Sequence, residues 1–229
     1  MKTPLWSLLR PPASAAGRVL GRPTILDRGP DDRHALALTF DDGPGEATES
    51  IARTLEEHDC RGTFFMLGPA VERYPELVRS LVAAGHEVGN HLWSHLDAAD
   101  LSHAAIRSEI RQTAATLCRV AGVKTTLLRP PYCSAPGRVA LSAVRTGVEH
   151  IVLRSVDPAD WRAVATSQVV DDTIASIGSG DIVCLHDGVS PTNTGTASRA
   201  VTAAAVAALL PILLERGLRP VTVSELLRR

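Results

Sequence analysis

Aromatic side chains, excess charge of one sign and long apolar runs are all scarce in this chain. Aromatic residues make up 3% of its 229 residues, so few rings are available to stack on sugars or bases. The formal net charge is −1, so no strong field attracts nucleic acid or an anionic membrane, and we expect no nucleic-acid partner. The longest apolar run, residues 203–214, contains Pro211. It is shorter than the roughly 20 residues that cross a bilayer, so we expect no membrane span.

The cysteines are few and widely separated. Cys60, Cys118, Cys133 and Cys184 form no C-x-x-C pair, which argues against a structural zinc ribbon or a thioredoxin-like site. Their density is also too low for a disulfide-stapled scaffold. Cys60, Cys118 and Cys184 stand in apolar stretches, and we expect them to pack as small core residues.

The N-terminal segment lacks the features of an export signal. Residues 1–9 offer one lysine and a brief apolar patch before Arg10, whereas a secretory signal needs about 7–15 uninterrupted apolar residues. We therefore expect a cytoplasmic protein, and secretion only if the true start lies upstream of Met1. As a separate expectation, the protein is a monomer. Residues 1–34 are rich in Arg, Pro, Gly and Ala without a sustained period, which predicts an irregular leader before a domain over 35–229.

From Ala35 onward, short apolar segments alternate with longer amphipathic ones. Strands are predicted over residues 35–41, 62–67, 86–90, 126–128, 150–156, 182–185 and 220–223. Helices are predicted over residues 48–58, 69–84, 102–120, 136–145, 167–177 and 198–216. Ser102 is a predicted N-cap, and Gly178 and Gly217 are predicted helix stops. The alternation indicates an α/β fold with a mainly parallel sheet, either a β/α barrel or an open doubly wound sheet.

The placement of polar residues favours the barrel. Such residues fall at the carboxyl ends of five predicted strands: Asp41 and Asp42, His91, Arg129, Asp157, and His186. In β/α barrels this face carries the active site, whereas an open sheet would gather functional residues at one switch point. Five contributing strand ends are more typical of a barrel.

Two adjacent carboxylates, Asp41 and Asp42, end the first predicted strand and precede Gly43-Pro44. Their charges repel, so this placement is unfavourable without compensation. A metal ion would remove that penalty for one carboxylate and leave the other free as a base. A simple turn rich in Asp and Gly would explain the same string without any function.

His91 and His95 place two imidazoles four residues apart after a predicted strand. They can converge on one ion if the segment turns helically. A lone histidine on an apolar background more often has a packing role, but this pair accompanies the Asp-Asp sequence and favours a metal. Two imidazoles and one carboxylate would leave positions open for water and substrate, as in catalytic zinc sites. Cobalt, nickel, manganese or iron would also accept these ligands.

Three further segments carry candidate functional residues. Arg129, Pro131 and Tyr132 follow a strand in a loop that prolines stiffen, so this loop could orient a carboxylate and line a pocket. Residues 157–161 combine two carboxylates with a tryptophan, and residues 183–187 end an apolar strand in His-Asp. Each also has a structural explanation: a proline-rich loop, a half-buried tryptophan, or a core or helix-capping histidine.

These five segments, in this order, resemble the NodB-homology polysaccharide deacetylases, the fourth family of carbohydrate esterases. The similarity extends from about Leu36 to Leu227 and includes residues 62–65, 85–90 and 221–226. The resemblance implies a distorted β/α barrel of about seven strands.

The resemblance also implies a role for each motif residue. Asp42, His91 and His95 would bind one divalent ion, zinc in the first place. Asp41 would act as the general base, with Arg129 positioning it, and His186 would protonate the departing amine, with Asp160 tuning its basicity. The substrate pocket would be lined by Pro131, Tyr132 and Trp161, and the backbone N–H of Tyr132 would stabilise the oxyanion. Cys133 and Cys184 depart from the family pattern, which usually has a small residue and Leu there, and this affects substrate fit.

The implied reaction is hydrolysis of N-acetyl groups on an amino sugar, oligosaccharide or polysaccharide. The shortage of aromatic residues favours a short or single-sugar substrate. Other hypotheses are an O-acetyl esterase acting on a glycan such as xylan, and an amidohydrolase of a non-sugar acetylated metabolite. A catalytically inactive sugar-binding module is a further hypothesis. Such a module would be expected to lack Asp41 or His186, yet both are present.

Overall fold

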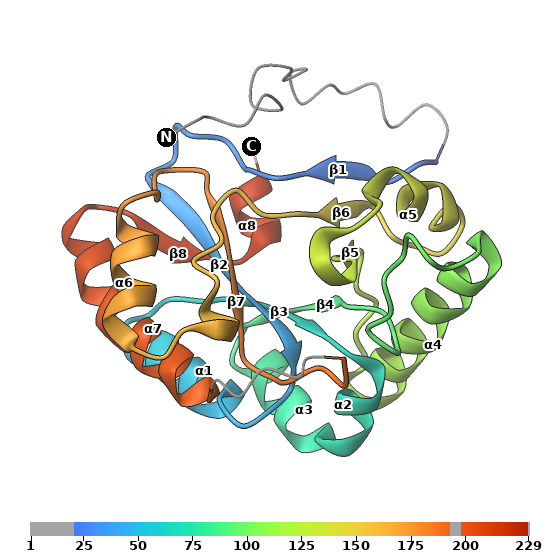
Figure 1. The fold of residues 1–229 in the computed structure, drawn as a ribbon, viewed down its shortest axis with the longest axis horizontal. Coiled ribbons are helices and arrows are strands. Elements are labelled where there is room, and N and C mark those ends of the chain that lie inside the picture. The colour runs from blue at the N-terminus through green and yellow to red at the C-terminus, as the bar shows by residue number, and fades with distance from the viewer. Residues whose placement is uncertain (1–20, 193–197, 229) are drawn as a thin grey trace.

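The computed structural model describes residues 21–192 and 198–228. Its centre is an eight-stranded sheet of order β1-β6-β5-β4-β3-β2-β7, with β8 also paired to β2. The strands are β1 (Thr24–Leu26), β2 (Ala35–Gly43), β3 (Thr63–Met66), β4 (Glu87–Asn90), β5 (Leu127–Leu128), β6 (His150–Val152), β7 (Ile182–His186) and β8 (Arg219–Val221). All of these pairings are parallel. The sheet curls on itself (Figure 1), so the predicted distorted barrel is confirmed.

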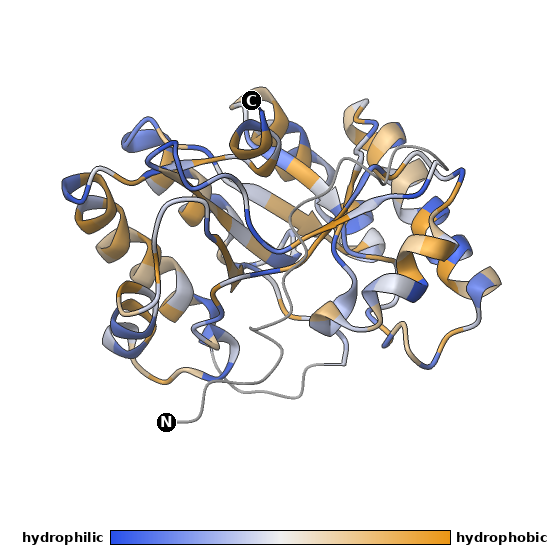
Figure 2. Ribbon diagram, turned by 90° about the horizontal axis from the view of Figure 1, so that it is seen from above, coloured by the Kyte–Doolittle hydropathy of each residue, from blue (hydrophilic) through white to orange (hydrophobic). Residues whose placement is uncertain are grey.

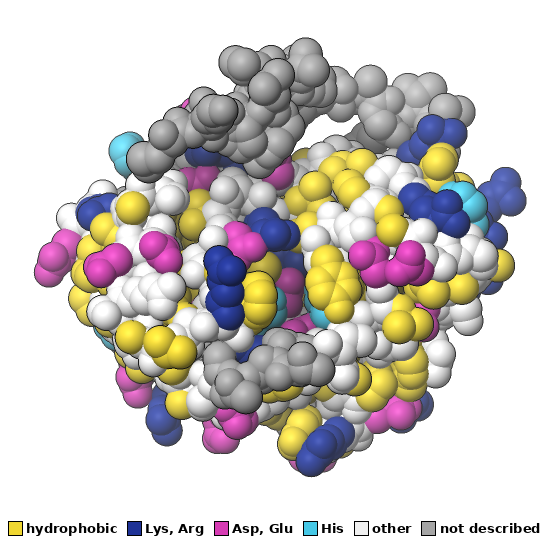
Figure 3. All heavy atoms as spheres, viewed as in Figure 1, with side chains coloured by type: hydrophobic (Ala, Val, Ile, Leu, Met, Phe, Trp, Pro, Cys, Tyr) yellow, Lys and Arg dark blue, Asp and Glu magenta, His cyan; other side chains and the backbone are white. Residues whose placement is uncertain are grey.

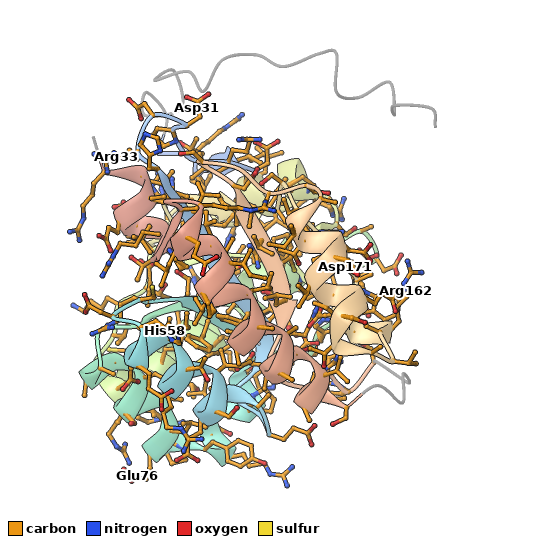
Figure 4. The ribbon with its side chains drawn as sticks, turned by 90° about the vertical axis from the view of Figure 1, so that its left-hand side faces the viewer. Asp31, Arg33, His58, Glu76, Arg162 and Asp171 are labelled. Atoms are coloured by element: carbon orange, nitrogen blue, oxygen red, sulfur yellow. The ribbon has the colours of Figure 1, made fainter. Side chains whose placement is uncertain are left out.

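Helices surround the curled sheet. They are α1 (Thr48–Glu57), α2 (Gly68–Arg73), α3 (Pro75–Ala83), α4 (His103–Ala121), α5 (Pro136–Ser142), α6 (Thr166–Ile174), α7 (Arg199–Glu215) and α8 (Val223–Leu227), with short 3₁₀ turns η3 (Pro131–Cys133) and η4 (Asp160–Arg162). Apolar and polar residues are mixed along most of these helices (Figure 2), as expected for helices that lie between a core and water. Charged side chains such as Arg162 and Asp171 lie at the periphery (Figure 4). Within the described ranges, no helix combines the length and apolar character needed to cross a membrane.

The alternation of side chains along β2 explains where the polar site begins. Leu36, Leu38 and Phe40 pack outward against the helices, in the largest apolar cluster. Ala35 and Ala37 point to the opposite side, where they pack with α8 residues in a second cluster. Because side chains alternate with a period of two, the next residues on that inner side are Thr39 and Asp41. The interior of the barrel therefore changes from apolar to polar toward the carboxyl end of β2.

Several predicted element boundaries were wrong. The strand β1 lies within the predicted leader and pairs with β6, so the folded domain begins before residue 35; residues 1–20 of that leader lie outside the described ones. The predicted helix 69–84 is divided into α2 and α3 at Tyr74, because the ring of Pro75 disfavours helical geometry for the preceding residue. The predicted strand 220–223 ends at Val221, where α8 follows with Thr222 as its N-cap.

Some of the predicted helix caps and cysteine environments are confirmed and others were wrong. Ser102 caps α4 by accepting a hydrogen bond from the Ala105 N–H, and Gly217 follows α7 with a φ of 70°. Gly178 is not a helix stop, because α6 already ends at Ile174. Among the cysteines expected in the core, Cys60 and Cys184 are buried, but Cys118 is exposed on the outer face of α4.

Candidate active site

A cavity of about 510 Å³ opens at the carboxyl ends of the strands. Its lining residues are Asp41, Asp42, His91, His95, Tyr132, Cys133, Arg154, Asp157, Trp161, Cys184, His186, Ser190 and Thr192. Figure 3 shows this hollowed face, with histidine and acidic atoms on the floor of the hollow. Seven of the ten candidate site residues from the sequence border the cavity directly, and the other three lie in the layer behind it.

A backbone irregularity brings both adjacent carboxylates into this cavity. Along a regular strand, Asp41 and Asp42 would point to opposite faces. The register between β2 and β3 shifts at this position, and Asp42 has a φ of 73°. Such bulges bend a strand and re-aim a side chain. Asp42 consequently turns toward the same cavity as Asp41, and both carboxylates are buried.

Asp42 meets the two predicted histidine ligands. Its Oδ1 lies 3.1 Å from His95 Nε2 and 3.5 Å from His91 Nε2. His91 Nδ1 donates to the backbone carbonyl of Arg129 over 2.8 Å, and His95 Nδ1 lies 2.6 Å from Thr192 Oγ1. Hydrogen bonds at Nδ1 orient both rings and leave both Nε2 atoms directed at Asp42, as second-layer partners do in metal sites.

The donor set fits a divalent metal ion. The three donor atoms lie within 4.8 Å of one another, and all three residues are buried. Asp42 Oδ1 is a buried oxygen that has no hydrogen-bond partner among the described residues, which is unfavourable unless another group satisfies it. One carboxylate and two imidazoles match the ligand types of zinc and related ions.

The loop that carries His91 and His95 is not a helical turn, so that part of the prediction was wrong. Leu92 and His95 both have positive φ angles, of 64° and 59°. Glu109 on α4 holds the loop by accepting hydrogen bonds from the backbone N–H groups of residues 93 and 94, each over 2.8 Å. The histidines converge because the loop folds back on itself under these bonds.

Asp41 is held by the buried Arg129. Arg129 Nη1 donates to Asp41 Oδ1 over 2.8 Å and to Thr39 Oγ1 over 2.7 Å. Burial alone would raise the pKa of Asp41, but the positive charges of Arg129 and His91 outweigh it and keep this pKa below its usual value. Asp41 is therefore a carboxylate at neutral pH, and its Oδ2 is left facing the cavity.

His186 at the end of β7 is paired with the fully buried Asp160. His186 Nδ1 lies 2.8 Å from Asp160 Oδ1. Asp160 Oδ2 accepts from the His186 backbone N–H over 2.8 Å and from Thr202 Oγ1 over 2.7 Å. Burial lowers the pKa of His186, but the charge and hydrogen bond of Asp160, together with the charges of Asp41 and Asp42, outweigh it and raise this pKa to about 9. The imidazole is therefore protonated at neutral pH and its Nε2 is left for the cavity.

The two predicted aromatic residues stand at the rim. Tyr132 is 55% exposed and Trp161 is 38% exposed. The Tyr132 ring lies 4.9 Å from that of His95, and the Tyr132 hydroxyl lies 2.8 Å from Thr192 Oγ1. Pro131 does not border the cavity as predicted; it is buried behind Tyr132 at the start of η3, where it restricts the backbone of this loop.

Sequence reasoning missed several residues of the site. Thr192 contacts both His95 and Tyr132, but a single threonine in a polar segment carries no recognisable signal. Arg154 lines the cavity and pairs with Asp157 over 2.8 Å; its position just after a strand, like that of Arg129, could have indicated it. Asp187 lies outside the cavity, packed against Gly43, where an added Cβ would lie 2.1 Å from its carboxylate.

Comparisons with known proteins agree with this geometry. The family model described as polysaccharide deacetylase matches residues 28–151. The chain belongs to the polysaccharide deacetylase family. It is 36% identical over 202 residues to a peptidoglycan-N-acetylglucosamine deacetylase of Bacillus cereus, covering 87% of this chain and 91% of that protein.

Two further similarities support the membership. The chain is 35% identical over 190 residues to a chitooligosaccharide deacetylase of Sinorhizobium fredii, covering 80% of this chain and 87% of that protein. The crystal structure of a peptidoglycan N-acetylglucosamine deacetylase superposes with a TM-score of 0.81 at 28% identity, covering 89% of this chain and 92% of the other. The family predicted from the five motifs is thus confirmed, and the relatives are named as carbohydrate N-deacetylases.

Proposed function

We propose that this polysaccharide deacetylase hydrolyses the N-acetyl group of an N-acetylglucosamine-type residue in a glycan. One observation carries the proposal. A carboxylate held by an arginine (Asp41) and an imidazole held by a carboxylate (His186) flank the same three-residue donor group in one cavity. Hydrolysis of an amide requires one group that removes a proton from water and another that delivers a proton to the leaving amine.

The residues divide this work between them. A divalent ion held by Asp42, His91 and His95 would polarise the acetyl carbonyl and acidify the attacking water. Asp41 accepts the proton of that water, and its ion pair with Arg129 fixes the direction of its free oxygen.

Other residues of the cavity carry out the remaining steps. The ring of Tyr132 contacts that of His95, and we assign the backbone N–H of Tyr132 to stabilise the oxyanion, a contribution that typically amounts to a few kcal/mol. His186 gives its proton to the departing amine. Asp160 acts through His186: it keeps the imidazole protonated and orients its ring.

The shape of the site supports a short stretch of sugar as the bound substrate. A cavity of about 510 Å³ lies within the range of about 300–1,000 Å³ found for small-ligand sites. Tyr132 and Trp161 at the rim are both exposed, and aromatic rings at such positions can contact a sugar. The names of the relatives point to peptidoglycan or chitooligosaccharides, and both contain N-acetylated amino sugars.

The test is acetate release by protein that has been stripped of metal and then reloaded with zinc or cobalt. The panel contains N-acetylglucosamine, its oligomers, peptidoglycan fragments and acetylated xylan. We expect release from the N-acetylated members only after metal is restored, with no steady increase along the oligomer series. If no member of the panel released acetate although stoichiometric metal was bound, the proposal would be overturned. Preferential release of acetate from xylan would instead indicate an O-acetyl esterase.

A further inference from the structure

A second group of potential metal ligands adjoins the first. Asp41, Cys184 and His186 each offer one donor atom, and the three atoms lie within 4.8 Å of one another. Asp41 Oδ2 lies only 3.4 Å from Cys184 Sγ. The strand pairing explains this convergence, because Asp41 is the register partner of His186 on the neighbouring strand. Cys184 stands two residues before His186 and therefore points to the same face.

The chemistry of this group is that of a zinc site. Thiolate, imidazole and carboxylate are the three protein ligand types that zinc uses, and ligands about 2.0–2.3 Å from one ion lie roughly 3–4 Å from one another. Asp41 and Cys184 already satisfy this spacing, and His186 needs a shift on the order of an ångström. Asp41 and Cys184 are buried, so the ligand atoms are shielded from bulk water.

The surrounding contacts leave the right atoms free. His186 Nδ1 is occupied by Asp160 over 2.8 Å, which matches the carboxylate–histidine pairs that stand behind zinc ligands. Asp41 Oδ1 is occupied by Arg129. Oδ2 accepts only the Cys184 thiol hydrogen bond among the described residues, and an ion that binds both atoms replaces that bond. These partners therefore orient Asp41 and His186 so that one ligand atom of each lies within 4.8 Å of Cys184 Sγ.

We propose that Asp41, Cys184 and His186 form a second zinc site, which fills when zinc exceeds one equivalent and then stops turnover. Asp41 Oδ2 lies 3.9 Å from His91 Nε2, so the two ions would lie close together and repel each other. For this reason the second site binds more weakly than the first. As the ion binds, the S–H proton of Cys184 passes to solvent. The imidazole of His186, which is protonated at neutral pH, also releases its ring proton to solvent, and no electrons are transferred.

The inhibitory consequence follows from the atoms that the second ion would occupy. It would take Oδ2 of Asp41, which accepts the Cys184 thiol hydrogen bond, and the ring nitrogen of His186 that carries the acid proton. Asp41 and His186 serve as base and acid in the reaction proposed above. This consequence rests on the proposed function, whereas the binding of the second ion does not.

The experiment uses the full chain and follows metal binding separately from turnover. Metal-stripped protein is titrated with Co²⁺, and the near-ultraviolet thiolate-to-cobalt charge-transfer band is recorded together with the number of ions bound. We expect the band to appear only with the second equivalent. With Zn²⁺, we expect acetate release to rise with the first equivalent and to fall about tenfold once the second site is nine-tenths occupied.

Two variants test the assignment to Cys184. Cys184→Ser and Cys184→Ala are expected to bind one equivalent, to lack the band and to escape inhibition, each measured against its own rate at one equivalent. Retention of that first equivalent reports that the variant is folded. Cys133→Ser, which removes the other thiol lining the cavity, and Cys118→Ser, which removes the exposed thiol, are expected to keep both equivalents and the band.

The outcomes separate the two proposals. A band and a second equivalent that persist in both Cys184 variants would overturn the second site. A band that depends on Cys184, without inhibition by zinc, would support the site and contradict the roles given to Asp41 and His186.

Discussion

Two groups of donor atoms in one cavity, Asp42–His91–His95 and Asp41–Cys184–His186, differ in how their atoms are satisfied. In the first, Asp42 Oδ1 is buried without a hydrogen-bond partner among the described residues. In the second, Arg129 holds Asp41 and Asp160 holds His186 through short hydrogen bonds. An unsatisfied oxygen between two imidazoles suits a group that permanently holds an ion, whereas charge-paired side chains with one free atom suit proton transfer.

The largest expected effect, on both metal binding and activity, comes from disrupting the first donor group, Asp42–His91–His95. His91→Ala removes one of three ligands and the ring that Arg129 orients, so we expect bound metal to be lost and acetate release to fall below detection. Metal content and rate are measured on the same purified sample. His58→Ala, a matched deletion of an imidazole at the periphery (Figure 4), should change neither. Normal turnover of His91→Ala would mean that this group does not hold the ion.

The next largest effect distinguishes the two donor groups, because it lowers the rate without loss of metal from the first. Asp41→Asn keeps the size of the side chain but removes its basicity, so we expect the rate to fall by about 10²–10⁴-fold, the usual contribution of a general base. The first equivalent of metal should still bind, because Asp42, His91 and His95 are intact. Parallel measurements of kcat and metal content check this. If the variant also lost the first equivalent, Asp41 would belong to the first group.

A smaller effect concerns the pH dependence of the acid. Because Asp160 raises the pKa of His186 to about 9, His186 is protonated at pH 7, and activity should decline only as the pH rises through that value. In Asp160→Asn this pKa should fall toward about 6.5. The alkaline limb should then move to lower pH, with a loss of roughly thirtyfold at about pH 8.

The control for this prediction keeps the charge of Asp160. Thr202→Val removes only the hydroxyl that donates to Asp160 Oδ2, so the alkaline limb should remain close to that of the wild-type protein. An unshifted limb in Asp160→Asn would show that another group provides the proton.

The sequence was sufficient to predict elements with a strong pattern. The strands β2 and β7 and the long helix α4 matched the predictions closely, because the two strands contain continuous apolar runs and α4 repeats apolar residues at helical spacing. The short strand β1 was missed, since three residues in a Pro- and Gly-rich segment carry no period. Its pairing with β6 depends on a contact between residues more than a hundred positions apart.

The site was predictable in composition but not in geometry. Residue type and spacing predicted that His91, His95 and one carboxylate of the Asp41–Asp42 pair bind a metal, and the family resemblance chose Asp42. Their convergence depends on positive φ angles at Asp42, Leu92 and His95. L-residues adopt this conformation at a cost of roughly 1–2 kcal/mol each, so no propensity predicts it. The tertiary structure imposes it, for example through the hydrogen bonds that Glu109 accepts from the loop.

The smallest expected effect tests a residue that the sequence did not reveal. Thr192 Oγ1 lies 2.6 Å from His95 Nδ1, and Thr192→Val removes this partner while preserving the shape of the side chain. Loss of such a partner typically weakens metal binding 10–100-fold; we expect about tenfold, the lower end of that range, because His91 and Asp42 are unaffected. Competition with a chelator measures the change, and Thr192→Ser, which keeps the hydroxyl, should bind metal normally. Equal metal affinity in the valine and serine variants would show that the fold of the loop alone orients His95. The first donor group would then depend less than the second on hydrogen bonds from neighbouring side chains.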